Sequence, residues 1–369
     1  MPEDELMALL TLNRIDGLGC TGAKFLYEQL GSAKEIFKCR NHLKELIPGV
    51  RQSLIEALND TGYFSFVSEE IEFIHRHGIS CITFADEEYP ARLRDCSDAP
   101  LVLFKLGNAD LNALHIVSIV GTRRPTEYGL RMCGSFVEEL YRLCPDIVVV
   151  SGLAYGIDIE AHKKSLSAGC CTVGVLGHGL DMIYPSSHRS IAKSMLENGA
   201  LVTEFMSRTA PFKNNFVRRN RIIAGLADAT VVVESKAKGG SLITAEIAES
   251  YNRDCFAFPG SVGDPCSVGC NELIRTNRAN LITSAEDFLN AMNWSTRSKT
   301  VPEQKKLFIE LSQDEEKVYE RIRVKAQGVH VNTIIVDCNI PYVKLTSILF
   351  NLEMKGLIKA SPGSVYKPL

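Results

Sequence analysis

Seven short apolar runs, separated by segments with helical patterning, restrict most strongly how this chain can fold. They begin at residue 79 and read ISCITF, HIVSIV, DIVVVS, TVGVLG, ALVTEF, ATVVVE and DCFAFP. Their apolar residues are continuous rather than alternating, which is typical of strands buried on both faces, and the helices between them supply βαβ crossovers. The pattern predicts a doubly wound α/β domain with a mostly parallel sheet, spanning residues 67–292.

The flanking segments predict two further domains and a linker. Residues 1–66 are helical in pattern and contain IDGLGCTGAKFLYEQLG and ELIPGVRQSLIEALN, which resemble helix-hairpin-helix motifs of a SAM-like domain; their turns either bind phosphate or only build a helical bundle. Residues 293–306 lack apolar periodicity and predict a linker. Residues 307–369 read as three helices and a terminal hairpin, the outline of a winged helix, with Ser312 and Asp314 placed to cap its first helix.

Composition narrows the class of protein. The chain is 45% hydrophobic and 23% charged, has no basic segment before an apolar stretch at its start, and has no apolar run near the roughly 20 residues that cross a bilayer. We therefore expect a cytoplasmic protein without membrane contact. The 12 cysteines are scattered and lack zinc-site spacing, so we expect reduced thiols, no metal and no cofactor. With a net charge of −3, any nucleic-acid site must be a local basic patch.

The loops that follow the predicted strands carry the candidate binding residues, because open α/β sheets bind ligands at the carboxyl ends of their strands. After HIVSIV come Gly121, Thr122, Arg123 and Arg124. Gly121 allows close approach of the backbone, Thr122 offers a hydroxyl, and the two arginines stand at the start of the next helix. Together they predict a phosphate site. The run DIVVVS ends at Ser151, and the loop after it begins with Gly152 and also leads into a helix.

Two further segments extend the same rim. The run KNNFVRRNR, residues 213–221, is predicted to be a basic loop, because charge runs usually face water. It combines basic side chains with one aromatic residue and contains no acid, and proteins hold single-stranded nucleic acid with such residues by backbone contacts and base stacking. The glycine-rich turn at Gly240 and Ser241 either closes this rim or only caps a helix. The candidate DNA-binding residues are Gly121, Thr122, Arg123, Arg124, Ser151, Gly152, Lys213, Phe216, Arg218, Arg219, Asn220, Arg221, Gly240 and Ser241.

Catalytic motifs are missing from the sequence. It contains no GxxxxGK[ST], GxGxxG, GxSxG or HExxH pattern, which favours binding over catalysis. Asp158 and His162 lie four residues apart, which is more typical of a local hydrogen bond than of an acid–base pair. The alternative is a nucleotide-binding hydrolase on the same fold, with Asp158 or Glu246 as acid or base. Another is a transcription regulator that reads duplex DNA with its winged helix, although the candidate recognition helix is largely apolar.

Seven ordered segments resemble the DNA-processing protein A family, also called DprA or Smf. They are SIVGTRRPTEYG, VVSGLAYGIDIEAH, GVLGHGLDMIYP, TEF, FVRRNRIIAGLADATVVVES, GGSLITAEIAE and FAFPGSVGDPCSVGCNELI. The resemblance implies a Rossmann-like domain that binds single-stranded DNA, as a homodimer, and performs no chemical reaction. It also implies a recombination mediator that protects incoming DNA and helps to load the RecA recombinase during natural transformation.

Individual residues match the family's pattern, with some departures. Arg123 matches the arginine after the family's Gly-Ser/Thr pair, Lys213 and Phe216 match its DNA-contacting lysine and aromatic, and residues 219–221 match its RNR signature. Val217 replaces a usual proline, His188 replaces a common asparagine, and Asn277-Arg278-Ala279 replaces a usual Gly-Ala, which adds a positive charge late in the domain.

Overall fold

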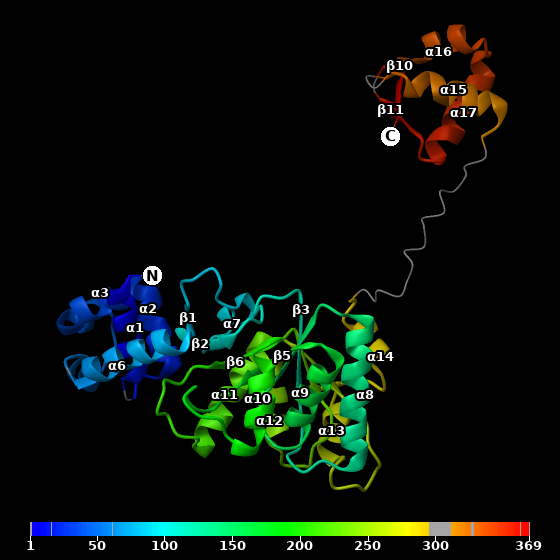
Figure 1. Cartoon of the computed structure of the whole chain (residues 1–369). Coiled ribbons are helices and arrows are strands. Elements are labelled where there is room, and N and C mark those ends of the chain that lie inside the picture. Colours follow the sequence, from blue (N-terminus) through cyan, green and yellow to red (C-terminus); the bar gives the residue numbers. More distant parts are fainter. Residues whose placement is uncertain are drawn as a thin grey trace. The chain divides into compact units, whose positions relative to one another are not determined.

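The computed structural model describes residues 2–15, 17–60, 62–294, 311–325, 328–361 and 363–368. The chain divides into two compact units, Met1–Arg297 and Ser298–Leu369, which are coloured blue to yellow and orange to red in Figure 1. Residues 295–306 of the predicted linker lie outside the described residues.

The first part of the larger unit is helical, as predicted. Its elements are α1 (Glu3–Arg14), α2 (Gly19–Leu30), α3 (Ala33–Lys38), η1 (Arg40–His42), α4 (Leu43–Leu46), α5 (Gln52–Leu58) and α6 (Gly62–His77). Helix α6 continues past the predicted boundary at residue 66. Buried apolar residues of these helices share one cluster with Val102, Phe104 and Met206, so the helices pack against the edge of the sheet that follows (Figure 1).

The central sheet confirms the predicted α/β class. Its strands are β1 (Ser80–Thr83), β2 (Val102–Gly107), β3 (His115–Val120), β4 (Ile147–Ser151), β5 (Cys171–Val175), β6 (Gly199–Thr203), β7 (Ala229–Val232), β8 (Asp254–Ala257) and β9 (Asn280–Leu281). In the described chain their order is β1-β2-β6-β5-β4-β3-β7-β8-β9. The strands from β6 to β9 are parallel, whereas β1 and β2 are antiparallel to their neighbours. Strands β2 and β9 were not among the predicted runs.

The strand order contains a topological switch point. The chain proceeds from β3 through β4 and β5 to β6 on one side, then returns to the other side of β3 to form β7, β8 and β9. The loops after β3 and β7 therefore diverge at the carboxyl edge of adjacent strands. A crevice at such a point is where doubly wound sheets bind ligands.

Helices cover both faces of the sheet, which explains the continuous apolar runs. Ile116 and Val120 of β3 belong to one buried cluster, whereas Val117 and Ile119 belong to another, because successive side chains of a strand point to opposite faces. The covering and connecting helices are α7 (Ala91–Arg94), α8 (Glu127–Leu143), α9 (Ile157–Ala168), η2 (Ser186–His188), α10 (Arg189–Met195), α11 (Lys213–Leu226), α12 (Gly240–Ser250), α13 (Val268–Arg275) and α14 (Ala285–Ala291).

The smaller unit has the predicted winged-helix outline. It contains α15 (Gln313–Arg323), α16 (Val331–Cys338) and α17 (Tyr342–Met354), with β10 (Val329–His330), β11 (Ile358–Ser361) and β12 (Val365–Pro368) in the order β10-β12-β11. Ser312 forms a capping box with Glu315 at the start of α15, which confirms its predicted role. Asp314 instead forms an ion pair with Lys344 on α17.

Within the described residues, no single helix is long and apolar enough to cross a bilayer. Helices α16 and α17 pass the test of length and composition only as a pair, bent by 111°.

Candidate nucleic-acid interface

A groove of about 870 Å³ lies at the carboxyl edge of the sheet, bordered by the loops that follow β3 and β7 and by α11 and α12. Nine of the predicted site residues line it: Gly121, Thr122, Arg123, Lys213, Phe216, Arg219, Asn220, Gly240 and Ser241. The structure thus brings together residues from three separate segments of the chain. Their meeting place is the switch point of the strand order.

The segment KNNFVRRNR forms the first turns of helix α11 rather than the loop that its charge suggested. This corrects the prediction of its conformation. Helical spacing divides the segment's side chains: Lys213, Phe216 and Asn220 line the groove, whereas Arg218 and Arg221 point elsewhere. Four basic residues that look equivalent in the sequence therefore have different surroundings.

An aromatic corner occupies one end of the groove. The rings of Phe216 and Tyr184 lie 5.7 Å apart with an interplanar angle of 37°, and the guanidinium carbon of Arg123 lies 5.8 Å from the Phe216 ring centre. A Cβ added to Gly177 would lie 2.9 Å from Cδ1 of Phe216, so this glycine leaves room for the ring. Tyr184, which is exposed, was missed by sequence reasoning, although an aromatic residue in the loop sequence DMIYP after a predicted strand was a usable signal.

Arg219 lies beneath the groove instead of on its surface. It is only 3% exposed, and its Nη1 donates a hydrogen bond of 2.9 Å to the carbonyl oxygen of Val175. Burial lowers the pKa of Arg219 to about 10, while the charge of Asp158 opposes that change. Burial likewise raises the pKa of the Asp158 carboxyl, and Arg219 opposes the shift. The arrangement is a buried pair of opposite charges, which suits a structural role better than a phosphate contact.

Ser151 and Gly152 also take buried positions. Ser151 Oγ donates a hydrogen bond of 2.6 Å to the carbonyl oxygen of Ile119, which joins β3 and β4. A Cβ at Gly152 would lie 1.7 Å from Nη1 of Arg219, so the absence of a side chain there makes room for the guanidinium group. Both residues support the groove from behind. Arg124, in contrast, is exposed beside the groove without lining it.

Asp158 and His162 do not hydrogen-bond to each other in the described structure. His162 is buried, and its Nδ1 lies 2.7 Å from Oγ1 of Thr172 on β5. Burial lowers the pKa of His162 to about 3, so the imidazole is neutral at physiological pH. The predicted local hydrogen bond between the two side chains is therefore wrong, because the carboxylate and the imidazole find different partners.

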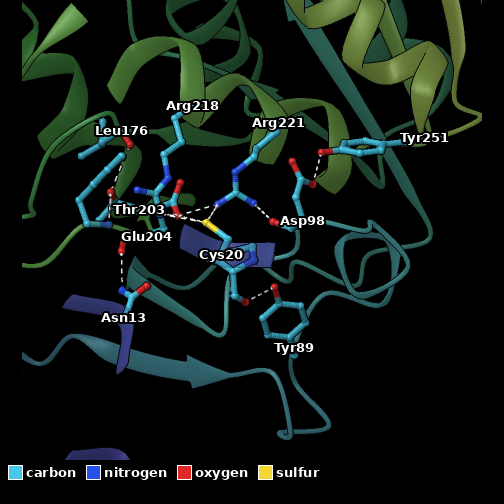
Figure 2. Close-up of polar contacts among 12 residues, drawn as sticks. Asn13, Cys20, Tyr89, Asp98, Leu176, Thr203, Glu204, Arg218, Arg221 and Tyr251 are labelled. Atoms are coloured by element: carbon cyan, nitrogen blue, oxygen red, sulfur yellow. Dashed lines mark hydrogen bonds and ion pairs between the residues drawn. The ribbon is translucent and has the colours of Figure 1, made fainter. Parts of the chain in front are cut away.

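Arg218 and Arg221 converge on a buried carboxylate behind α11 (Figure 2). Their Nη2 atoms lie 2.7 Å and 2.6 Å from Oε2 of Glu204, whose side chain is fully buried. The same two nitrogens lie 2.9 Å and 3.0 Å from Sγ of Cys20 in helix α2. Asn13 of α1 donates to the backbone oxygen of Glu204 at 3.3 Å. This cluster joins the amino-terminal helices to the helix that carries the aromatic corner.

The opposite end of the groove contains cations that sequence reasoning did not select. Lys236 and Lys238 lie in the loop after β7, and Arg278 lies after α13; all three line the groove. Gly239 provides no side-chain cap to α12, and Ser241 Oγ donates to Ser235 Oγ at 2.9 Å. The amino end of α12 thus presents backbone N–H groups, which favour anions.

Among the residues described, no group of three or more His, Cys, Asp or Glu side chains is arranged to hold a metal ion.

Fold and groove together define a Rossmann-like α/β protein with a basic, aromatic-lined groove at its switch point and an appended winged helix. A family model described as DNA recombination-mediator protein A matches residues 80–293, and a model of the DprA winged helix domain matches residues 303–364. The chain belongs to the DprA/Smf family of DNA recombination mediators.

Curated relatives and solved structures agree with this assignment. The chain is 36% identical to DNA processing protein DprA of Streptococcus pneumoniae over 70% of this chain and 86% of that protein, and 34% identical to protein Smf of Escherichia coli over 85% and 87%. The S. pneumoniae DprA structure superposes with a TM-score of 0.61 at 29% identity, covering 79% of this chain and 98% of that one. The structure of DprA from Helicobacter pylori, described for its single-stranded DNA binding mode, superposes with a TM-score of 0.53 at 29% identity. The superposition covers 58% of this chain and 95% of that one.

Proposed function

We propose that this protein holds single-stranded DNA in the groove between the loops after β3 and β7, and that it acts there by binding rather than by catalysis. A role in DNA processing as a recombination mediator follows from its family. The relative from H. pylori binds single-stranded DNA according to its structural description, which supports the same ligand here.

The aromatic corner is the observation that carries the proposal. Phe216 and Tyr184 line one end of a groove that also contains Arg123 and Lys213, so a base could stack where the flanking phosphates meet cations. Single strands are bound with little sequence preference when their bases stack on aromatic rings and their phosphates contact basic side chains along a groove. A duplex keeps its bases stacked on each other, so this groove should discriminate against it.

The finer parts of the proposal rest on the family resemblance. In it, the protein coats incoming DNA as a homodimer, protects it and helps to load a RecA-class recombinase during natural transformation. Two grooves in one dimer would raise the effective concentration of the second site for a strand already bound at the first, which strengthens binding without new contacts.

The hydrolase alternative has weaker support. Asp158 is buried against Arg219, and His162, four residues further along the chain, hydrogen-bonds with Thr172, so Asp158 and His162 do not form an acid–base pair. Glu246 lines the groove, but among the described residues no hydrogen bond or ion pair joins it to a histidine or to a second carboxylate, so no acid–base pair is formed there. Incubation with nucleoside monophosphates, followed by detection of free base or phosphate, tests this alternative directly.

Fluorescence anisotropy of labelled oligo-dT and of a matched duplex, over a series of salt concentrations, tests the binding proposal. We expect the single strand to bind more tightly. Arg123→Ala and Lys213→Ala should each lower the salt slope by roughly 0.7 to 1, because each removes one phosphate contact. Phe216→Ala should cost about 1–3 kcal/mol of binding free energy with little change in slope, because stacking releases no counterions.

Two controls keep this experiment specific. Arg142→Ala removes an exposed charge on α8, outside the groove, and should leave binding unchanged. Phe216→Leu preserves most of the side-chain volume but not the flat ring, so it should behave like the alanine variant if stacking is the cause. Wild-type binding by all of the groove variants would refute the proposal.

A further inference from the structure

The groove is longer than the aromatic corner. Asn220, one helical turn beyond Phe216 on α11, donates to the carbonyl oxygen of Gly240 at 3.5 Å, so this turn of α11 lies against the start of α12. From there the lining continues to Glu246 on α12 and to Arg278, which forms an ion pair with Glu249. We call this second end of the groove the distal half. It is lined by Lys236, Lys238, Gly240, Ser241, Glu246 and Arg278.

The charges of the distal half favour an anion. Lys236 and Lys238 are exposed, and neither forms an ion pair in the part of the chain that the structure describes. Arg278 uses Nε to contact Glu249 at 2.8 Å, which leaves its two terminal nitrogens as further donors. Three cations thus line the distal half together with one carboxylate, Glu246, while Glu249 pairs with Arg278 from outside the lining.

The amino end of α12 adds donors for the same ligand. It opens into the groove at Gly240, where a Cβ would meet no atom within 4 Å. The backbone N–H groups of a helix amino end, next to the flexible cations Lys236 and Lys238, match the donors that phosphate oxygens accept.

We propose that the distal half is a second phosphate-binding segment, which holds the backbone of nucleotides beyond the base stacked on Phe216. The inference rests on the proposed binding of single-stranded DNA and extends it, since it assigns Lys236, Lys238 and Arg278 to the strand. Arg278 stands where the sequence departs from its family's pattern, so it would lengthen the binding site of this particular protein.

Length dependence separates the two halves of the groove. Anisotropy is measured with the full chain and oligo-dT of about 4 to 16 nucleotides, over a salt series. Arg278→Gln and Lys238→Gln should bind the shortest strands like wild type, but should lower the salt slope by roughly 0.7 to 1 for each charge removed once the strand reaches the distal half. Lys213→Gln should weaken binding at every length.

Matched variants complete the test. Arg275→Gln removes an exposed guanidinium three residues from Arg278 that pairs with Glu272 outside the groove, and it should leave binding unchanged at all lengths. Glu246→Gln removes the opposing charge and should tighten the binding of long strands several-fold. Melting temperatures of all variants show whether they remain folded.

The results distinguish a failure of the distal half from a failure of the proposed binding of single-stranded DNA. If Arg278→Gln and Lys238→Gln bind like wild type at every strand length while Lys213→Gln weakens binding, the distal half does not bind DNA. The proposed strand site at Phe216 is then still supported. If Lys213→Gln and Phe216→Ala are also without effect, the proposed function fails and the inference fails with it.

Discussion

Neighbouring arginines of one helix show how much a residue's surroundings decide its role. Arg218 is partly exposed, whereas Arg219 and Arg221 are 3% and 5% exposed, and each of the three faces a carboxylate or a carbonyl oxygen of the protein. Burying a charge is costly unless it is compensated. The two buried arginines therefore hold α11 in place, while Lys213 keeps its charge available to a ligand.

Stability should depend on pH through His162. Its pKa is lowered from 6.5 to about 3 in the folded protein, so the unfolded chain binds a proton that the folded chain does not bind between these values. Unfolding should therefore become easier as the pH falls below about 6.5, by up to about 1.4 kcal/mol per pH unit. Urea denaturation at several pH values measures this. The slope should be shallower for His162→Gln, and an unchanged slope would contradict the assignment.

Helix α11 is the element on which the site depends. Its groove face carries Lys213 and Phe216, and its other face is fixed by Glu204 from the segment after β6 and by Cys20 from α2 (Figure 2). The carboxylate of Glu204 compensates two guanidinium groups at once. The orientation of the aromatic corner thus depends on contacts made on the opposite side of the helix.

Glu204→Gln should destabilise the protein and weaken strand binding together. Removing one partner of a buried ion pair typically costs about 3–5 kcal/mol, because the remaining charge stays buried without compensation. Urea denaturation measures the loss, and anisotropy with oligo-dT at a temperature where the variant is folded measures binding. Glu204→Gln combined with Arg221→Met should recover part of the stability, since it removes a buried charge that has lost its partner. No recovery would indicate that Glu204 acts through other contacts.

At the scale of the whole molecule, the groove belongs to one compact unit and the winged helix to the other. The exposed side chains of α17 include Val343, Phe350 and Met354, while Lys344 and Lys355 form ion pairs with Asp314 and Glu315 of the same unit. A recognition helix that reads duplex DNA needs polar and basic side chains directed at base edges and phosphates. This surface is better suited to a protein partner.

Removal of residues 298–369 should leave the strand site intact. The remaining unit retains its own buried clusters and every residue that lines the groove. We expect residues 1–297 to bind oligo-dT within about twofold of the full chain, with the same salt slope, because the number of phosphate contacts is unchanged. A large loss of affinity would assign the winged helix a part in strand binding.

Local sequence was sufficient for most of the fold. The apolar runs of β3, β4 and β5 predicted buried parallel strands, because covering helices on both faces require continuous apolar character. Strand β2 was missed although LVLFKLG is similarly apolar; it pairs antiparallel with β1 and β6, so it is not part of a βαβ unit. The helical state of residues 213–221 was also missed, because like charges three residues apart disfavour an isolated helix and their compensation comes from distant carboxylates.

The sequence by itself determined the class of fold, the family and the segments that border the groove, since periodicity, turn residues and ordered motifs are local properties of the chain. Only the tertiary structure decided which side chains of those segments face the groove. Tyr184, Lys236 and Arg278 joined the site, whereas Arg219 and Arg221 became buried supports. The physical reason is that exposure and charge compensation depend on residues far away in the sequence, such as Asp158 and Glu204, which only folding brings into contact.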